Sequence, residues 1–358
     1  MGATVRWVRK RAPNASLRLM SQMKWALMIL AAAAVVGCTK KDTPTPAAEE
    51  AAAVEEEKQA VAAVELIEPL PESVDVNMDK VLLGRSLFHD TALSGDGTVA
   101  CVTCHMLDHG GAEPRKTSTG IRGQVGPINS PTVLNAGFNF VQFWDGRAKD
   151  LQEQAAGPVE NPIEMGAKWD EVVERLRKNA EYVATFAKLY KDGITKDSVT
   201  DAIAEYEKSL ITPSRFDQFL RGDETAITDA EKSGYATFKE VGCAACHIGV
   251  GAGGNMFQKM GLVNDYFADR GTPVTEADLG RFNVTKKAAD KYFFKVPTLR
   301  NVELTSPYLH DGSRATLEET VQVMGKYQLG KDLTDAQVNG IVTFLKSLTG
   351  ELPTHANP

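Results

Sequence analysis

Apolar side chains recur at helical spacing along most of the chain after residue 65, while alternating runs typical of strands are few. Side chains three and four residues apart share one face of a helix, so this pattern predicts a mainly α protein. The predicted helices cover 78–90, 169–178, 196–210, 228–242, 316–327 and 334–348. Three begin with Thr and carry Glu or Gln three residues later, which is the spacing of a capping box: Thr228, Thr316 and Thr334.

The first 37 residues have a different composition, which is typical of an export signal. They hold six basic residues and no acidic one, and an apolar run over 25–36 leads into Gly37 and Cys38. This run is too short to cross a membrane comfortably. The Val-Val-Gly-Cys ending resembles the processing box of bacterial lipoproteins, in which the Cys is lipidated. An ordinary cleaved signal peptide with an incidental Cys is the alternative.

We therefore expect a periplasmic protein whose membrane contact is a lipid on Cys38, and Thr39 in place of Asp favours the outer membrane. Residues 38–64 are rich in Ala, Glu and Pro, without an aromatic residue, and predict a flexible tether. Residues 38–358 carry 34 basic and 47 acidic side chains, a net charge of −13. This charge argues against nucleic acid as a partner and would attract a basic protein.

The other four cysteines form two similar motifs, CVTCH at 101–105 and CAACH at 243–247. Two thiols three residues apart can reach the two vinyl groups on one edge of a haem, and the next His can ligate its iron. A single C-x-x-C could also be a redox pair or half of a zinc site. A disulfide framework would not explain the paired His. The repeated motif predicts two covalent c-type haems, held by Cys101, Cys104 and His105 and by Cys243, Cys246 and His247.

The two motifs lie 142 residues apart, and each follows a predicted helix. We therefore predict two tandem cytochrome c-like domains, each with one covalent haem, at 65–213 and 214–352, followed by a tail at 353–358. Their junction is expected near 210–222. The GVGAGG sequence at 249–254 formally fits a dinucleotide-binding pattern, but it follows a haem motif rather than a strand, so we expect a loop there.

Several longer motifs resemble those of the bacterial di-haem cytochrome c peroxidases. They are INSPTVLNAGFNFVQFWDGRAKDLQEQAAGPVENPIEMG after the first haem motif, and KVPTLRN and TSPYLHDGS after the second. The resemblance extends from about residue 65 to 350. It implies reduction of hydrogen peroxide to water, with electrons from a small c-type cytochrome or a copper protein. It also implies a homodimer.

The resemblance implies a role for several residues at the first haem. His105 would be the proximal ligand of the low-potential, peroxidatic haem. Glu164 would be the acid/base above this haem, and Gln154 would help to place peroxide and water. The residues agree with these roles, because splitting peroxide heterolytically requires a proton to move from the near oxygen to the far one, and a carboxylate can move it.

Other roles concern the second haem and the contact between the domains. Trp144 would lie on the electron path, and His247 with Met324 would ligate a high-potential haem. A thioether opposite an imidazole raises the potential of the iron, which suits a haem that accepts electrons. By residue type alone, Trp144 and Met324 would be assigned to the core. The resemblance also implies a calcium ion, whose oxygen ligands come from Asn129, Thr305 and Pro307.

The chain departs from the family pattern at one position. Most members carry a second His directly after an S-x-G stretch, and this His covers the distal face of the peroxidatic haem. Here Ser118-Thr119-Gly120 is followed by Ile121, and the neighbouring motifs keep the family spacing. Ile has no lone pair for iron, so we predict that the first haem is open or water-bound even when oxidised.

Two other functions are compatible with two haems. A maturase like the one that oxidises tryptophans in methylamine dehydrogenase also lacks the distal His, but it uses Tyr where this chain has Met324. A simple di-haem electron carrier would keep both irons six-coordinate. Of the remaining histidines, we assign His310 to a structural hydrogen bond near the second haem. The others are expected at the surface or on the proximal side, and they are His89, His109 and His355.

Overall fold

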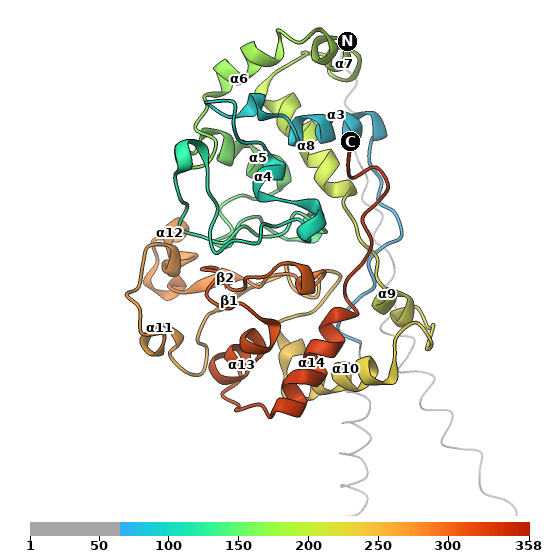
Figure 1. Cartoon of the computed structure of the whole chain (residues 1–358), viewed down its shortest axis with the longest axis vertical. Coiled ribbons are helices and arrows are strands. Elements are labelled where there is room, and N and C mark those ends of the chain that lie inside the picture. The colour runs from blue at the N-terminus through green and yellow to red at the C-terminus, as the bar shows by residue number, and fades with distance from the viewer. Residues whose placement is uncertain (1–64) are drawn as a thin grey trace, which may run out of the picture. The chain divides into compact units, whose positions relative to one another are not determined.

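The computed structural model describes residues 65–358, so the predicted signal peptide, tether and lipidated Cys38 lie outside the described residues. The described part is mainly helical, as predicted, with 12 α-helices and one two-stranded antiparallel sheet (Figure 1). The helices are α3 (Met78–Phe88), α4 (Cys101–Cys104), α5 (Leu151–Glu160), α6 (Trp169–Leu176), α7 (Ala180–Leu189), α8 (Lys196–Ser209), α9 (Arg215–Leu220), α10 (Asp229–Val241), α11 (Tyr266–Asp269), α12 (Phe282–Thr285), α13 (Leu317–Gln328) and α14 (Asp335–Lys346). The strands are β1 (Phe257–Lys259) and β2 (Phe293–Lys295).

All six predicted helices are present, and their start signals work as expected. At the start of α10, the Thr228 hydroxyl accepts a hydrogen bond from the Glu231 N–H (3.2 Å), and the Glu231 carboxylate accepts one from the Thr228 N–H (2.7 Å). The helix ends at Gly242, which has a φ of 107°, a value that glycine adopts readily. The other six helices were not predicted. Four of them are short, α4, α9, α11 and α12; of the two longer ones, α5 contains Pro158 and α7 leaves part of its apolar face exposed.

Two large clusters of buried apolar residues form the interior. The first is built mainly on α3, α5, α6 and α8, and Cys101 packs against it. The second is built mainly on α10, α13 and α14, and Cys243 packs against it. Each haem-attachment motif therefore lies beside its own core. Two residues cross this division, since Ile67 belongs to the second cluster and Ala356 to the first.

Three stretches of chain run between the two cores along one side of the structure. They precede α3, follow α8 and follow α14, and Figure 1 shows them on the right in blue, yellow-green and red. Hydrogen bonds tie them together: the Leu70 N–H donates to the Asp217 carboxylate (2.7 Å), and Ser214 pairs with Gly350 in a β-bridge. The last residues are held as well, because the Tyr206 hydroxyl donates to the Ala356 carbonyl (2.6 Å).

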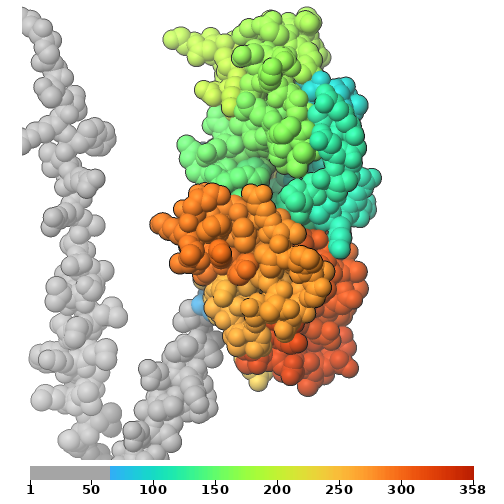
Figure 2. Space-filling view, turned by 90° about the vertical axis from the view of Figure 1, so that its left-hand side faces the viewer, coloured from blue at the N-terminus to red at the C-terminus, as the bar shows by residue number. Residues whose placement is uncertain are grey.

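The loop that precedes α5 packs against the hairpin of β1 and β2. The Lys295 N–H donates to the Trp144 carbonyl (2.8 Å), and the Phe140 N–H donates to the Gly254 carbonyl (2.8 Å). The Arg281 guanidinium donates to the carbonyls of Asp145 (3.0 Å) and Gly146 (2.8 Å). In Figure 2 the orange surface of the C-terminal half meets the green surface of the N-terminal half along this contact. The two haem-attachment regions are thus joined by backbone hydrogen bonds as well as by the connecting chain.

Among residues 65–358, no helix has both the length and the apolar character needed to cross a membrane.

The second core depends on a close crossing of α10 and α14. A Cβ atom added to Gly234 of α10 would collide with the carbonyl oxygen of Gly340, which is backbone and has no freedom to turn away. A Cβ atom added to Gly340 would meet only the Gly234 Cα, at an ordinary 3.8 Å. The two glycines face each other, but only one of them is required by space.

We predict opposite effects on stability for alanine at these two positions. Gly234→Ala should lower the free energy of unfolding by about 1–3 kcal/mol, because the helices must separate. Gly340→Ala should leave it unchanged or raise it by up to about 1 kcal/mol, because Ala favours the helix over Gly. Urea unfolding of the haem-loaded proteins measures both, and equal destabilisation by the two variants would contradict this account of the crossing.

Candidate haem and peroxide site

The first attachment motif places its imidazole with one ring nitrogen already bound. Helix α4 carries Cys101 and Cys104, and His105 follows directly. The His105 Nδ1 lies 3.3 Å from the Gly111 carbonyl and 3.3 Å from the Ser130 hydroxyl. Burial lowers the pKa of His105, so the ring is neutral at physiological pH. A neutral ring that donates from Nδ1 keeps the lone pair of Nε2 for a metal.

The second motif repeats this arrangement. The His247 Nδ1 lies 3.2 Å from the Ala252 carbonyl, and burial lowers the pKa of His247 to about 4. The cysteines agree with covalent attachment rather than thiolate chemistry. Burial raises the pKa of Cys101 and of Cys243 to about 12, and that of Cys104 to about 11. Thiols with such pKa values are poor metal ligands and poor redox nucleophiles.

One cavity, which we call the second cavity because it adjoins the second haem motif, brings the predicted ligands of the second haem together. His247 and Met324 both line it, as do the thiols Cys243 and Cys246. Much of the remaining lining is apolar and comes from the second core, including Phe238. An imidazole and a thioether facing one apolar cavity are the ligand set that raises the potential of a haem iron.

A buried cation in the same cavity provides an independent test of the fit to haem. Lys295, the last residue of β2, is only 6% exposed and lines the cavity. Burial lowers its pKa to about 8, and no charged side chain of residues 65–358 offsets this effect. A buried charge is costly unless it is paired. A haem carries two propionates, which would supply the missing anion, so the residues present fit the cofactor.

Glu164 lies in the turn that follows α5 and is half-buried. Its Oε1 accepts a hydrogen bond from the Asn161 side-chain amide (2.7 Å). Burial raises the pKa of Glu164, while the positive charge of Arg147 and the Asn161 hydrogen bond oppose this rise. A raised pKa makes a carboxyl group better suited to accept a proton and return it during catalysis. Gln154 is half-buried on α5, and in the described structure no hydrogen bond joins its side chain to Glu164.

Ile121 lies directly beside the Glu164 turn. Its N–H donates to the Glu164 carbonyl (2.8 Å), and its side chain is 2% exposed within the first core. Gly120 fits against the backbone of Ile163 and Glu164 so closely that a Cβ would collide with both carbonyl oxygens. The backbone of Gly120 and Ile121 therefore fastens this loop to the turn that carries Glu164.

Trp144 lies where the N-terminal half meets the second cavity. Its indole N–H donates to the Asn129 carbonyl (2.9 Å), and its ring makes edge contacts with Phe294 and His310. Trp144 also lines the cavity that holds His247 and Met324. The predicted calcium ligands Asn129, Thr305 and Pro307 also line this cavity.

His310 is buried and structural in its contacts. Its Nε2 lies 2.7 Å from the Asp278 carboxylate, and its ring stacks on Phe294 with centroids 4.5 Å apart. Arg270 also binds Asp278 through two hydrogen bonds of 2.7 and 2.8 Å.

Sequence reasoning missed Lys295, although a Lys inside the apolar stretch YFFKVP was a signal that could have been used. It also missed Arg147, whose charge acts on Glu164.

The fold and the two attachment motifs define a protein built for two c-type haems, and comparison with known proteins agrees. Residues 78–225 match the family described as di-haem cytochrome c peroxidase. The cytochrome c peroxidase of Escherichia coli is 50% identical over 80% of this chain, which spans 61% of that relative's length. The cytochrome c551 peroxidase of Nitrosomonas europaea is 45% identical over 83% of this chain, and the match covers 88% of that relative's length.

Among solved structures, a MauG-like protein associated with microbial copper homeostasis is similar with a TM-score of 0.70 and 29% identity. The similarity covers 79% of this chain and 93% of that one. The chain belongs to the di-haem cytochrome c peroxidase family. The predictions of the family, of its tandem cytochrome c-like fold and of a cytochrome c peroxidase enzyme are confirmed, and the family implies two c-type haems.

We predict that Lys295→Met lowers the reduction potential of the second haem. A unit charge at about 10 Å in an effective dielectric of about 20 contributes about 1.7 kcal/mol, or more than tenfold in the reduction equilibrium. Redox titration of the two-haem protein measures the shift, with Lys291→Met as the control, because Lys291 is exposed. An unchanged potential in a variant that keeps both haems would contradict a role for this buried charge.

Proposed function

We propose that this protein reduces hydrogen peroxide to water at the first haem, with electrons delivered one at a time through the second. The observation that carries the proposal is Glu164, a half-buried carboxyl group with a raised pKa, whose turn is bound to the loop of Ile121. In most members of this family the corresponding loop supplies the blocking His. A proton-transferring group next to a loop without an iron ligand favours chemistry over simple electron carriage.

Haem at Nε2 of His105 would supply an iron that binds peroxide and passes electrons to it. The protein supplies the protons and their direction. The Glu164 carboxylate accepts the proton from the oxygen nearer the iron and returns it to the far oxygen, which then leaves as water. Asn161 holds the Oε1 of this carboxylate, and Gln154 is proposed to place peroxide and water beside it. The complete reaction consumes two electrons and two protons for each hydrogen peroxide and yields two waters.

Electrons are proposed to enter at the haem of His247 and Met324 and to pass by Trp144. Support comes from the position of Trp144, which lines the second cavity while its indole is bound to Asn129 in the N-terminal half. A haem with a Met ligand and a nearby cation such as Lys295 favours the reduced state, which suits a haem that collects electrons.

A small basic c-type cytochrome or copper protein is the proposed donor, because residues 38–358 carry a net charge of −13.

We also propose a calcium ion at Asn129, Thr305 and Pro307. The Asn129 side-chain amide donates to the Arg115 carbonyl (3.1 Å), which leaves its carbonyl oxygen for a cation. A homodimer, two haem domains divided near residue 214, and a periplasmic location with a lipid on Cys38 complete the proposal.

A protein-modifying oxidase is the second candidate, and a MauG-like protein is among the similar structures. It is the weaker candidate because Met324 faces the second cavity where that branch uses Tyr. The relatives named as cytochrome c peroxidases are also more similar in sequence, at 45% and 50% identity. A simple electron carrier is disfavoured by Glu164, which such a protein does not need.

Glu164→Gln should lower peroxide turnover with a reduced small cytochrome by about 10²–10⁴-fold, because the amide cannot carry the proton. Glu160→Gln is the matched control, since Glu160 is an exposed residue four positions away. Steady-state kinetics measure both, and turnover that survives in Glu164→Gln would contradict the assignment.

The same carboxyl group should set the acid limb of the pH profile. Only the carboxylate accepts a proton, so kcat/KM should fall as the pH drops through the raised pKa of Glu164. Asn161→Ala removes a hydrogen bond that lowers this pKa, so the acid limb should move to higher pH. An acid limb that stays in place in Asn161→Ala would contradict the proposed role of the Asn161 hydrogen bond.

The as-isolated ferric protein should show a high-spin or water-bound signal from the first haem in absorption and EPR spectra. Turnover should then begin without a lag and without prior reduction. A low-spin signal typical of two imidazole ligands at the first haem, or a long lag that reductant abolishes, would show that another side chain covers the iron.

A further inference from the structure

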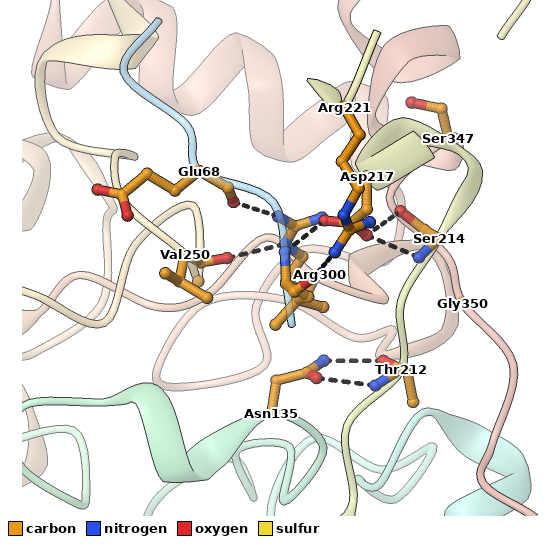
Figure 3. Close-up of polar contacts among 12 residues, drawn as sticks. Glu68, Asn135, Thr212, Ser214, Asp217, Arg221, Val250, Arg300, Ser347 and Gly350 are labelled. Atoms are coloured by element: carbon orange, nitrogen blue, oxygen red, sulfur yellow. Dashed lines mark hydrogen bonds and ion pairs between the residues drawn. The ribbon is translucent and has the colours of Figure 1, made fainter. Parts of the chain in front are cut away.

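A fully buried ion pair lies outside the proposed reaction path. The Arg300 guanidinium Nη1 lies 2.9 Å from the Asp217 carboxylate, and both side chains are 0% exposed (Figure 3). Burial lowers the pKa of Arg300, and the negative charge of Asp217 opposes this effect. Burying an ion pair brings little net stability unless further hydrogen bonds satisfy its atoms. The other partners of the pair therefore indicate its role.

Arg300 uses its other nitrogens to bind two backbone carbonyls. Its Nε donates to the Val250 carbonyl (3.1 Å), and its Nη2 donates to the Glu68 carbonyl (3.0 Å), as Figure 3 shows. Asp217 in turn accepts from the Leu70 N–H (2.7 Å) and from the Ser214 N–H (2.7 Å). The pair thus fixes residues 65–70, which we call the strap, against the loop that follows the second haem motif.

That loop, residues 248–254, carries the carbonyl that binds the haem ligand. The His247 Nδ1 lies 3.2 Å from the Ala252 carbonyl, two residues after Val250. The strap adds two backbone hydrogen bonds to the loop. The Gly249 N–H donates to the Leu66 carbonyl (2.7 Å), and the Glu68 N–H donates to the Gly249 carbonyl (3.3 Å).

The KVPTLRN segment holds the other side of the loop. The Thr298 hydroxyl donates to the Gly251 carbonyl (2.6 Å), and the Gly254 N–H donates to the Val296 carbonyl (2.7 Å). At Gly253, which has a φ of 131°, a Cβ would collide with the Pro297 carbonyl. Each residue from 249 to 251 is therefore fixed by the strap, by Arg300 or by Thr298. Groups that fix the hydrogen bond of a ligating His also fix its orientation and raise its basicity.

We propose that Arg300 and the strap are positioning elements for the second haem, which hold the 248–254 loop so that Ala252 accepts the hydrogen bond of His247. This inference rests on the proposed binding of the second haem at His247. Weaker hydrogen bonding at Nδ1 makes the imidazole less basic, which destabilises ferric iron. Loss of these contacts should therefore raise the reduction potential of the second haem and leave the first unchanged.

The test compares variants that alter single contacts in the two-haem protein. Arg300→Lys keeps a cation opposite Asp217 but lacks the fork that reaches two carbonyls. Glu68→Pro removes the N–H that binds Gly249, while Glu68→Ala is the matched control that shortens the side chain and keeps the N–H. Redox titration of both haems and hydrogen exchange of the 248–254 amides give readouts that do not depend on activity.

Arg300→Lys and Glu68→Pro should each shift the reduction equilibrium of the second haem by about tenfold, or about 59 mV upward for one electron. Exchange in the 248–254 loop should become faster, and Glu68→Ala should match the wild type. A second-haem potential that is unchanged, lowered, or shifted together with that of the first haem would overturn the inference.

Haem content and wild-type turnover separate failure of this inference from failure of the proposed function. If the wild type contains two haems and reduces peroxide, but Arg300→Lys and Glu68→Pro keep its potentials, only the positioning role fails. If the wild type carries no haem at His247, the proposed function fails as well, and so does the inference that depends on it.

Discussion

The hydrogen bond from each ligating imidazole to a backbone carbonyl is the interaction on which the rest of this structure depends. His105 and His247 turn Nδ1 toward Gly111 and Ala252, which leaves the Nε2 of each ring available for an iron. A carbonyl oxygen can fulfil this role only if its loop is rigid, because a mobile loop would leave the ring free to rotate. Much of the polar structure around the second motif fixes that loop. The segments that supply the fixing groups, residues 65–70 and 296–300, lie far apart in the sequence.

The two haem regions share this hydrogen bond from His to a backbone carbonyl, but they differ in the charges around them. The first has Glu164 nearby, together with the buried Glu113, whose charge acts on Cys104. The second has the buried cation Lys295, and the positive charge of Lys331 acts on Cys243. Negative charge stabilises ferric iron and positive charge stabilises ferrous iron, so both settings would place the reduction potential of the second haem above that of the first. The axial ligands would act in the same direction, and the difference between the two haems therefore does not depend on a single residue.

The sequence predicted much of the fold because its main signals are local. Capping boxes at Thr228, Thr316 and Thr334 marked where helices begin, and each helix starts there. The attachment motifs were equally clear, since the spacing of two thiols and a His has few other uses. The residues of the distal side were named only by resemblance, because a Glu in a turn has no local pattern that distinguishes it from a surface charge. Lys295 and Arg300 were not predicted, since their burial follows from contacts with segments distant in sequence.

The exchange of terminal segments has a consequence for the independence of the two halves. Ile67 completes the core of the C-terminal half, and Ala356 completes that of the N-terminal half, where Tyr206 also binds its carbonyl. If the chain were cut between α8 and α9, each of the two fragments would lack one residue of its own core. The two halves are therefore obligate neighbours, unable to dissociate or to be shuffled individually into other proteins. Electron transfer between the haems then needs no docking equilibrium, since the halves are held together by the ends of the same chain.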